Sequence, residues 1–161
     1  QVESADVVAY AYQGYDAGSV MAKIEGVDDV IKALKQKGVE AGGNDKPSVI
    51  VGYTAAYALF VHENREPKHA GEPRPSGLGN YWGPKGRPGF LLDVMREISG
   101  ELSNIIVETS KKGLPLIQAL YLAGLRLQRE SMLNVPVEYG FLRASAFTRP
   151  ENGGEVTEVE V

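Results

Sequence analysis

The stretch LPLIQALYLAGLRLQRESMLNVPVEYGFLRAS, from Leu114 to Ser145, decides how the chain folds. Its first part predicts a helix from Pro115 to about Leu133, because proline suits the first helical turn and apolar residues recur on one helical face. The residues of that face are Leu116, Leu120, Ala123 and Leu127, with Ile117 and Gly124 beside them. The stretch therefore begins with a packing helix.

A compact corner follows this helix. Pro136 disfavours a helical conformation at Val135 and so ends the helix. The next residues predict a turn at Gly140, where we expect a backbone conformation that alanine would resist. The residues assigned to this structural corner are Pro136, Gly140, Leu142, Arg143 and Ser145. Nothing in the corner has the arrangement of a catalytic site.

Three further elements are expected before the packing helix. Ser48–Tyr53, SVIVGY, has the β-branched residues of a buried strand, whereas residues 55–63 fit either a second strand or a short helix. Residues 90–112 predict one long helix with a seven-residue apolar repeat. Because only a few residues separate it from the packing helix, we expect the two helices to run antiparallel and to pack together.

The N-terminal part divides into a tyrosine-rich segment and a helix. Residues 1–23 fit either an edge strand or ordered tail, or an arm that lies on a neighbouring subunit. In the second interpretation Tyr10, Tyr12 and Tyr15 are interface candidates, since tyrosine is enriched at protein interfaces. Residues 27–37 predict a short amphipathic helix with aspartates in its first turn and lysines in its last.

The longest irregular stretch is residues 64–88, with five prolines and five glycines. A loop of this length is either functional or a solvated connection. In the functional interpretation it projects from the domain and contacts a partner through Tyr81, Trp82 and Arg87, since Trp, Tyr and Arg dominate interface hot spots.

The end of the chain predicts a β-hairpin. Residues 144–149 form its first strand, PENGG its turn, and residues 155–161 a second strand that alternates valine or threonine with glutamate. Its acidic face is either solvated or directed into a shared polar space. The candidates for that space are Glu155, Glu158 and Glu160.

Length and composition indicate one domain over residues 1–161, because 161 residues with 43% hydrophobic content support a single core. The net charge of −4 argues against a protein that holds nucleic acid on a basic face. The chain has no cysteine, which fits synthesis in a reducing compartment, and no apolar run long enough for a membrane helix. The expected fold class is α+β: a small antiparallel or mixed sheet on a pair of long antiparallel helices, with a long Gly/Pro-rich loop.

Catalytic and metal-binding patterns are missing from the sequence. His62 and His69 are the two histidines, and their spacing is not that of a helical zinc motif. No Gly-x-Ser-x-Gly elbow is present, and the glycine pairs at 77–79 and 83–86 lack the strand and helix that a phosphate loop needs. We therefore expect no enzyme activity, no cofactor and no metal.

Two pieces of the chain together resemble a known family. AAYALFVHEN, followed by the Gly/Pro-rich loop and RPGFLLDVMREI, resembles the "YA-x-x-V-H-E … FL" signature of tailed-bacteriophage neck proteins. VPVEYGFLRASAF resembles the "P-V-(D/E)-T-G-x-LR-x-S" corner of the same family, with Tyr139 where that motif has threonine. The resemblance covers roughly residues 48–149.

This resemblance implies a structural role in the phage virion. The family's head–tail joining and tail-completion proteins form hexameric or dodecameric rings between portal or adaptor and tail, and they leave a channel for DNA. It also implies synthesis in the host cytoplasm, a final location at the head–tail interface and no contact with a membrane. The alternatives are a minor capsid or decoration protein of the virion and, less favoured, a nucleic-acid-binding regulator or an enzyme.

Overall fold

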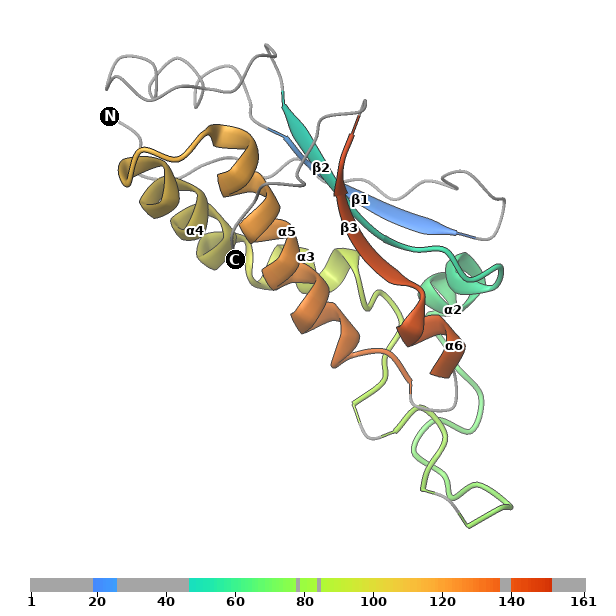
Figure 1. Cartoon of the computed structure of the whole chain (residues 1–161). Helices are drawn as coiled ribbons and strands as arrows, with labels where there is room; N and C mark the ends of the chain where they lie inside the picture. The colour runs from blue at the N-terminus through green and yellow to red at the C-terminus, as the bar shows by residue number, and fades with distance from the viewer. Residues whose placement is uncertain (1–18, 26–46, 78, 84, 137–139, 152–161) are drawn as a thin grey trace.

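The computed structural model describes residues 19–25, 47–77, 79–83, 85–136 and 140–151 (Figure 1). This part of the chain has an α+β fold, in which helices pack against a small antiparallel sheet, as expected from the sequence. The elements in chain order are β1 (Val20–Glu25), β2 (Ser48–Tyr53), α2 (Ala58–Glu63), α3 (Leu92–Glu97), α4 (Ser99–Lys111), α5 (Leu116–Met132), α6 (Gly140–Ala144) and β3 (Ala146–Pro150).

The sheet has the strand order β1-β2-β3, and both pairs are antiparallel. All six residues of the central strand β2 are buried, which confirms the strand predicted from its β-branched residues. Val51 lies opposite Ala22 on one side and Thr148 on the other. The open question at residues 55–63 is resolved in favour of a helix, α2.

Helix α5 lies across one face of the sheet (Figure 1). Its predicted apolar face is confirmed, because all four residues of that face are buried. The closest approach is at Gly124, where an added Cβ would lie 2.7 Å from Thr148 Cγ2 and 3.0 Å from Val49 Cγ1. A glycine at this position lets α5 pack closely on β2 and β3.

The single helix predicted for residues 90–112 is wrong, since the structure has two shorter helices, α3 and α4. The break is at Ile98, whose φ of −107° and ψ of 16° are not helical. Ser99 and Gly100 follow it, and both favour a helix less than alanine does. The Ser99 hydroxyl also donates to the Arg96 carbonyl at 3.1 Å, which offers the backbone a local alternative to the helical bond. Both helices contact α5, and α4 makes the larger contact.

Several expected features lie outside the described residues. They are the helix at 27–37, the second hairpin strand at 155–161 with Glu155, Glu158 and Glu160, and the three tyrosines Tyr10, Tyr12 and Tyr15. Of the predicted arm at 1–23, the last four residues belong to β1.

Candidate interaction surface

His62 joins α2 to the segment that enters α3. Its Nε2 accepts a hydrogen bond from the Leu92 amide at 3.2 Å, and its backbone carbonyl accepts one from the Gly89 amide at 2.8 Å. Because Nε2 is an acceptor, the ring proton is on Nδ1, which donates to Glu63 Oε2 at 2.5 Å. Burial lowers the pKa of the imidazole, so this histidine is neutral and both ring nitrogens are engaged. His62 is therefore a packing residue.

A second buried connection joins the sheet, α5 and the same segment. The Ser131 hydroxyl donates to the Phe90 carbonyl at 2.7 Å, and it therefore accepts from the Tyr53 hydroxyl, also at 2.7 Å. The Phe90 ring stands edge-on to Tyr53 at 5.1 Å and to His62 at 5.0 Å. Burial raises the pKa of Tyr53, so its hydroxyl stays protonated and acts as a donor. These contacts fix the frame from which the loop and the corner extend.

The corner at the end of α5 is built around Ser145. Its Oγ accepts a hydrogen bond from the Ala55 amide at 3.1 Å and donates to the Leu142 carbonyl at 2.8 Å. Its carbonyl accepts a bond from the Thr54 amide at 3.3 Å. Leu142 is fully buried, and the Nε of Arg143 donates to the Met132 carbonyl at 3.1 Å. The corner therefore attaches the chain after α5 to the end of β2.

The expectation for Gly140 is wrong. This glycine begins the short helix α6, it has no positive φ, and an added Cβ would meet nothing within 4 Å. The sequence around Gly140 predicted a turn, whereas the structure has a helix there, with space for a side chain at Gly140. Pro136 is instead packed against Gly86, where an added Cβ would lie 2.5 Å from Pro136 Cα.

The segment between α2 and α3 extends away from the body (Figure 1). It folds back on itself through paired backbone bonds, from the Gly71 amide to the Tyr81 carbonyl at 2.9 Å and from the Tyr81 amide to the Glu72 carbonyl at 2.8 Å. Its sides are further joined by a bridge between Pro73 and Asn80. The loop is therefore an organised projection in this part of the chain.

Trp82 does not project from this loop as an anchor. It is 8% exposed and belongs to the core of its own chain, and its φ of 63° is rare for a bulky residue. Arg87 is also engaged within the subunit, because it forms a two-pronged ion pair with Glu97 at 2.7 and 2.8 Å and donates to Asn134 Oδ1 at 3.1 Å. Both residues were predicted as contacts because of their residue types, whereas tertiary packing places them within the subunit itself.

The large exposed aromatic residues in the described part are Phe60, 72% exposed on α2, and Phe141, 85% exposed on α6. Both helices lie at the end of the molecule from which the loop extends (Figure 1). A hollow of about 600 Å³ lies between Phe60 and residues of the loop that line it together. It is lined by Phe60, Asn64, Glu66, Lys68, His69, Tyr81 and Trp82. We call Phe60, Phe141 and this hollow the loop-end surface.

Neither phenylalanine was predicted from the sequence as an interface residue. Phe60 lay in a segment whose helix or strand character was open, so its direction was undetermined. Phe141 lies between Gly140 and Leu142 of the expected corner and was not among the residues assigned to it. The helical spacing of Ala58, Val61 and His62, which are all buried, is the one signal that places Phe60 on the opposite side of α2.

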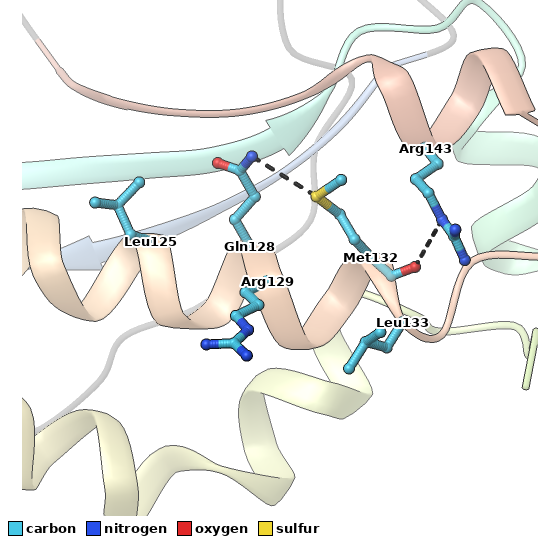
Figure 2. A pocket seen from close by; sticks show the side chains of 6 residues that line it. All are labelled: Leu125, Gln128, Arg129, Met132, Leu133 and Arg143. Atoms are coloured by element: carbon cyan, nitrogen blue, oxygen red, sulfur yellow. Dashed lines mark hydrogen bonds between the residues drawn. The ribbon is translucent and has the colours of Figure 1, made fainter.

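A separate groove of about 300 Å³ lies at the C-terminal half of α5 (Figure 2). Its lining is mostly apolar, and both of its charged residues are arginines. The lining residues are Leu125, Gln128, Arg129, Met132, Leu133 and Arg143. Figure 2 shows Met132 between Gln128 and Arg143. The Gln128 Nε2 donates to the Met132 sulfur at 3.8 Å, and the Arg143 Nε donates to the Met132 carbonyl at 3.1 Å.

The described residues contain no group of three or more His, Asp or Glu side chains placed to hold a metal ion. Among the same residues, no helix has the length and apolar character needed to cross a membrane.

Comparison of the chain with protein-family models, with curated proteins and with solved structures finds no match.

Proposed function

We propose that the chain is a structural subunit of a tailed-phage virion neck. Copies of it form a hexameric or dodecameric ring that joins the portal or adaptor to the tail and leaves a channel for DNA. The proposal begins from the two sequence pieces that resemble neck proteins. In the fold these pieces are in contact, because Ser145 of one bonds Ala55 of the other at 3.1 Å.

The residues of the resemblance have structural roles. In the first piece, His62 holds the Leu92 amide and packs on Phe90. In the second, Leu142 is buried and Arg143 holds the Met132 carbonyl. A signature composed of packing residues supports an assembly protein over an enzyme, because catalysis requires reactive groups that reach a substrate.

The observation that carries the proposal is the exposure of Phe60 and Phe141 at the loop end, 72% and 85%. Aromatic side chains are enriched in protein interfaces, where burying such a ring contributes about 2 kcal/mol or more. Both helices flank the projecting loop, so one end of the subunit offers an extended loop and two uncovered rings. This combination fits contact with a neighbouring subunit.

The test is the mass and shape of the purified protein, alone and in the virion. We expect six- or twelve-fold rings by electron microscopy and the corresponding mass by light scattering. Replacing both exposed rings, Phe60→Ser with Phe141→Ser, is expected to abolish rings while leaving the circular-dichroism spectrum unchanged. The matched control is Gly140→Ala, at a nearby position with open space. Rings that persist in the double variant would refute the role of this surface.

Copy number in purified particles separates this function from a minor capsid or decoration protein. A neck ring has six or twelve copies per virion at one site, whereas a decoration protein follows the icosahedral lattice in far greater number. Labelling at one vertex is the expected result. Labelling over the whole capsid would replace the neck function by the decoration function.

A further inference from the structure

The groove on α5 combines apolar and cationic side chains. Leu125, Arg129 and Leu133 follow one another at a spacing of four, so they lie on one side of the helix. Figure 2 shows Arg129 and Leu133 on this side. Arg129 has no carboxylate partner among the described residues. Arg143 uses its Nε for the Met132 carbonyl, and its terminal nitrogens can still donate to another acceptor.

Helix α2 has the opposite charge next to an exposed ring. Phe60 is 72% exposed, and the side chain of Glu63 is 52% exposed. Because these residues are three apart in a helix, their side chains are neighbours on its surface. Glu63 Oε2 accepts the bond from His62, and Oε1 can accept another donor, since both carboxylate oxygens are acceptors. The exposed face of α2 therefore presents a phenyl ring together with a carboxylate.

The exposed face of α2 fits the groove in size and in charge. An apolar cavity of about 150 Å³ holds a benzene molecule, and the groove has a volume of about 300 Å³. Both charged residues of the groove are arginines, which complement the acidic residue of α2. Phe60 and Leu133 are two of the four large hydrophobic residues that are exposed in the described part of the chain, and this contact would cover both.

The two surfaces are different patches of one chain. The groove and the hollow next to Phe60 have no lining residue in common. A ring with more than two subunits requires a contact of this kind, because its neighbouring subunits meet head to tail through two different surfaces. A second copy of the chain is therefore the occupant that the exposed face of α2 and the groove both fit.

We propose that Phe60 of one subunit inserts into the groove of a second copy, where Glu63 pairs with Arg129. This inference rests on the ring of the proposed function and names the two surfaces that meet in it. Arg129 is the partner because it has no carboxylate of its own among the described residues, whereas Arg143 already bonds Met132. The ring of Phe60 covers Leu133, which is 51% exposed in the single subunit.

The test is disulfide formation in the full chain with Phe60→Cys and Leu133→Cys. The chain has no cysteine, so an introduced pair reports only this contact. We expect a ladder of linked species up to six or twelve subunits, formed at least about tenfold faster than in the control pair Phe60→Cys with Leu114→Cys. Leu114 is also exposed, but it precedes the N-terminal end of α5, and the groove is at the other end.

Single variants separate this contact from others. A mixture of Phe60→Cys protein with Leu133→Cys protein is expected to give linked dimers, whereas neither protein alone should. Dimers from Phe60→Cys alone, or a disulfide within the monomer of the double variant, would overturn the proposal. Rings without the 60–133 link would overturn this pairing and leave the neck function intact. Linked dimers without closed rings would support the pairing and count against the neck ring.

The charge pair has a test without cysteines. In Arg129→Glu two carboxylates would face each other, and we expect the association constant of the subunits to fall at least about tenfold in sedimentation analysis. Arg129→Lys keeps the charge and should stay within about threefold. The control is Lys112→Glu, the same change of charge at an exposed position after α4, which should stay within about twofold. An unchanged constant in Arg129→Glu, with an unchanged urea midpoint, would show that Glu63 does not face Arg129.

Discussion

The Nε2 atom of His62 accepts a hydrogen bond from the backbone amide of Leu92 at 3.2 Å, and this bond holds α2 against the start of α3. The residues between them form the projecting loop. A neutral buried imidazole thus fixes both ends of the loop to the domain, and it makes the stability of the subunit depend on pH.

We expect the subunit to lose stability as the pH falls below about 6.5, the pKa of histidine in an unfolded chain. Burial lowers the pKa of His62 in the folded state, so the unfolded state binds the proton more tightly. The contribution of neutral His62 to the free energy of unfolding is complete above about pH 6.5. It decreases as the pH falls toward the pKa of His62 in the folded state. Urea unfolding across this window is the measurement.

The matched variant is His62→Gln, which removes the titrating group and is expected to flatten this part of the pH profile. At neutral pH it should cost about 1–3 kcal/mol, because a buried hydrogen bond is lost or distorted. His69→Gln, at an exposed position, is the control and should leave the free energy of unfolding at neutral pH unchanged. A profile that keeps its slope in His62→Gln would assign the pH dependence to other groups.

The hydrogen-bonded connection of Tyr53, Ser131 and Phe90 predicts how much each substitution in it lowers the free energy of unfolding. Tyr53→Phe removes one hydroxyl and should cost about 1 kcal/mol. Ser131→Ala should cost more, about 2–3 kcal/mol, because it leaves both the Tyr53 hydroxyl and the Phe90 carbonyl without this partner. The double variant should cost less than the sum. Urea midpoints of the four proteins test this order, and additive costs would contradict the shared bond.

Two helical glycines are predicted to respond to alanine with opposite signs. Gly124→Ala should destabilise the subunit by about 1–3 kcal/mol, since its Cβ would press on Thr148 and Val49 of the sheet. Gly100→Ala should stabilise α4 by up to about 1 kcal/mol, because nothing lies within 4 Å of the new Cβ. Thermal unfolding of the two variants is the comparison. A stabilised Gly124→Ala would mean that α5 and the sheet separate more easily than their packing indicates.

Substitutions at Trp82 and at Phe60 are expected to differ in their effect on the stability of the subunit. Trp82→Ala should cost about 3 kcal/mol or more, because the side chain is 8% exposed and packs in the core. Phe60→Ser should change stability by less than about 0.5 kcal/mol, because the ring is 72% exposed. Chemical unfolding of the subunit measures both. Equal stability of the two variants would contradict the packed position of Trp82.

The α5 helix and the β2 strand were predictable from sequence because their signals are local. A period of about 3.6 identified the buried face of α5, and consecutive β-branched residues identified β2. The break at Ile98 was less accessible, since the apolar repeat continues through it and only the low helix propensity of Ser99 and Gly100 indicated a stop. Repeat and propensity disagreed there, and the chain leaves the helical conformation at one residue, Ile98, before α4 begins at Ser99.

Most residues of the candidate surfaces could not be predicted from the sequence. Trp82 was the expected contact and is buried, whereas Phe60 and Phe141 are exposed and were not singled out. The role of a side chain depends on its surroundings as well as on its residue type. Those surroundings come from segments far apart in the chain. The hollow is an example, because it is lined by Phe60 of α2 and by Tyr81 and Trp82 of the loop.

The sequence by itself determined the α+β class, the strand at β2, the buried face of α5 and the absence of cysteine chemistry, since each depends on composition or on contacts within one turn or pleat. Only the tertiary structure decided the rest. It turned the segment around Gly140 into a helix and buried Trp82. It also placed His62 between two segments that are distant in sequence. The physical reason is that burial and hydrogen-bond partners are properties of segments brought together by folding, which no local pattern encodes.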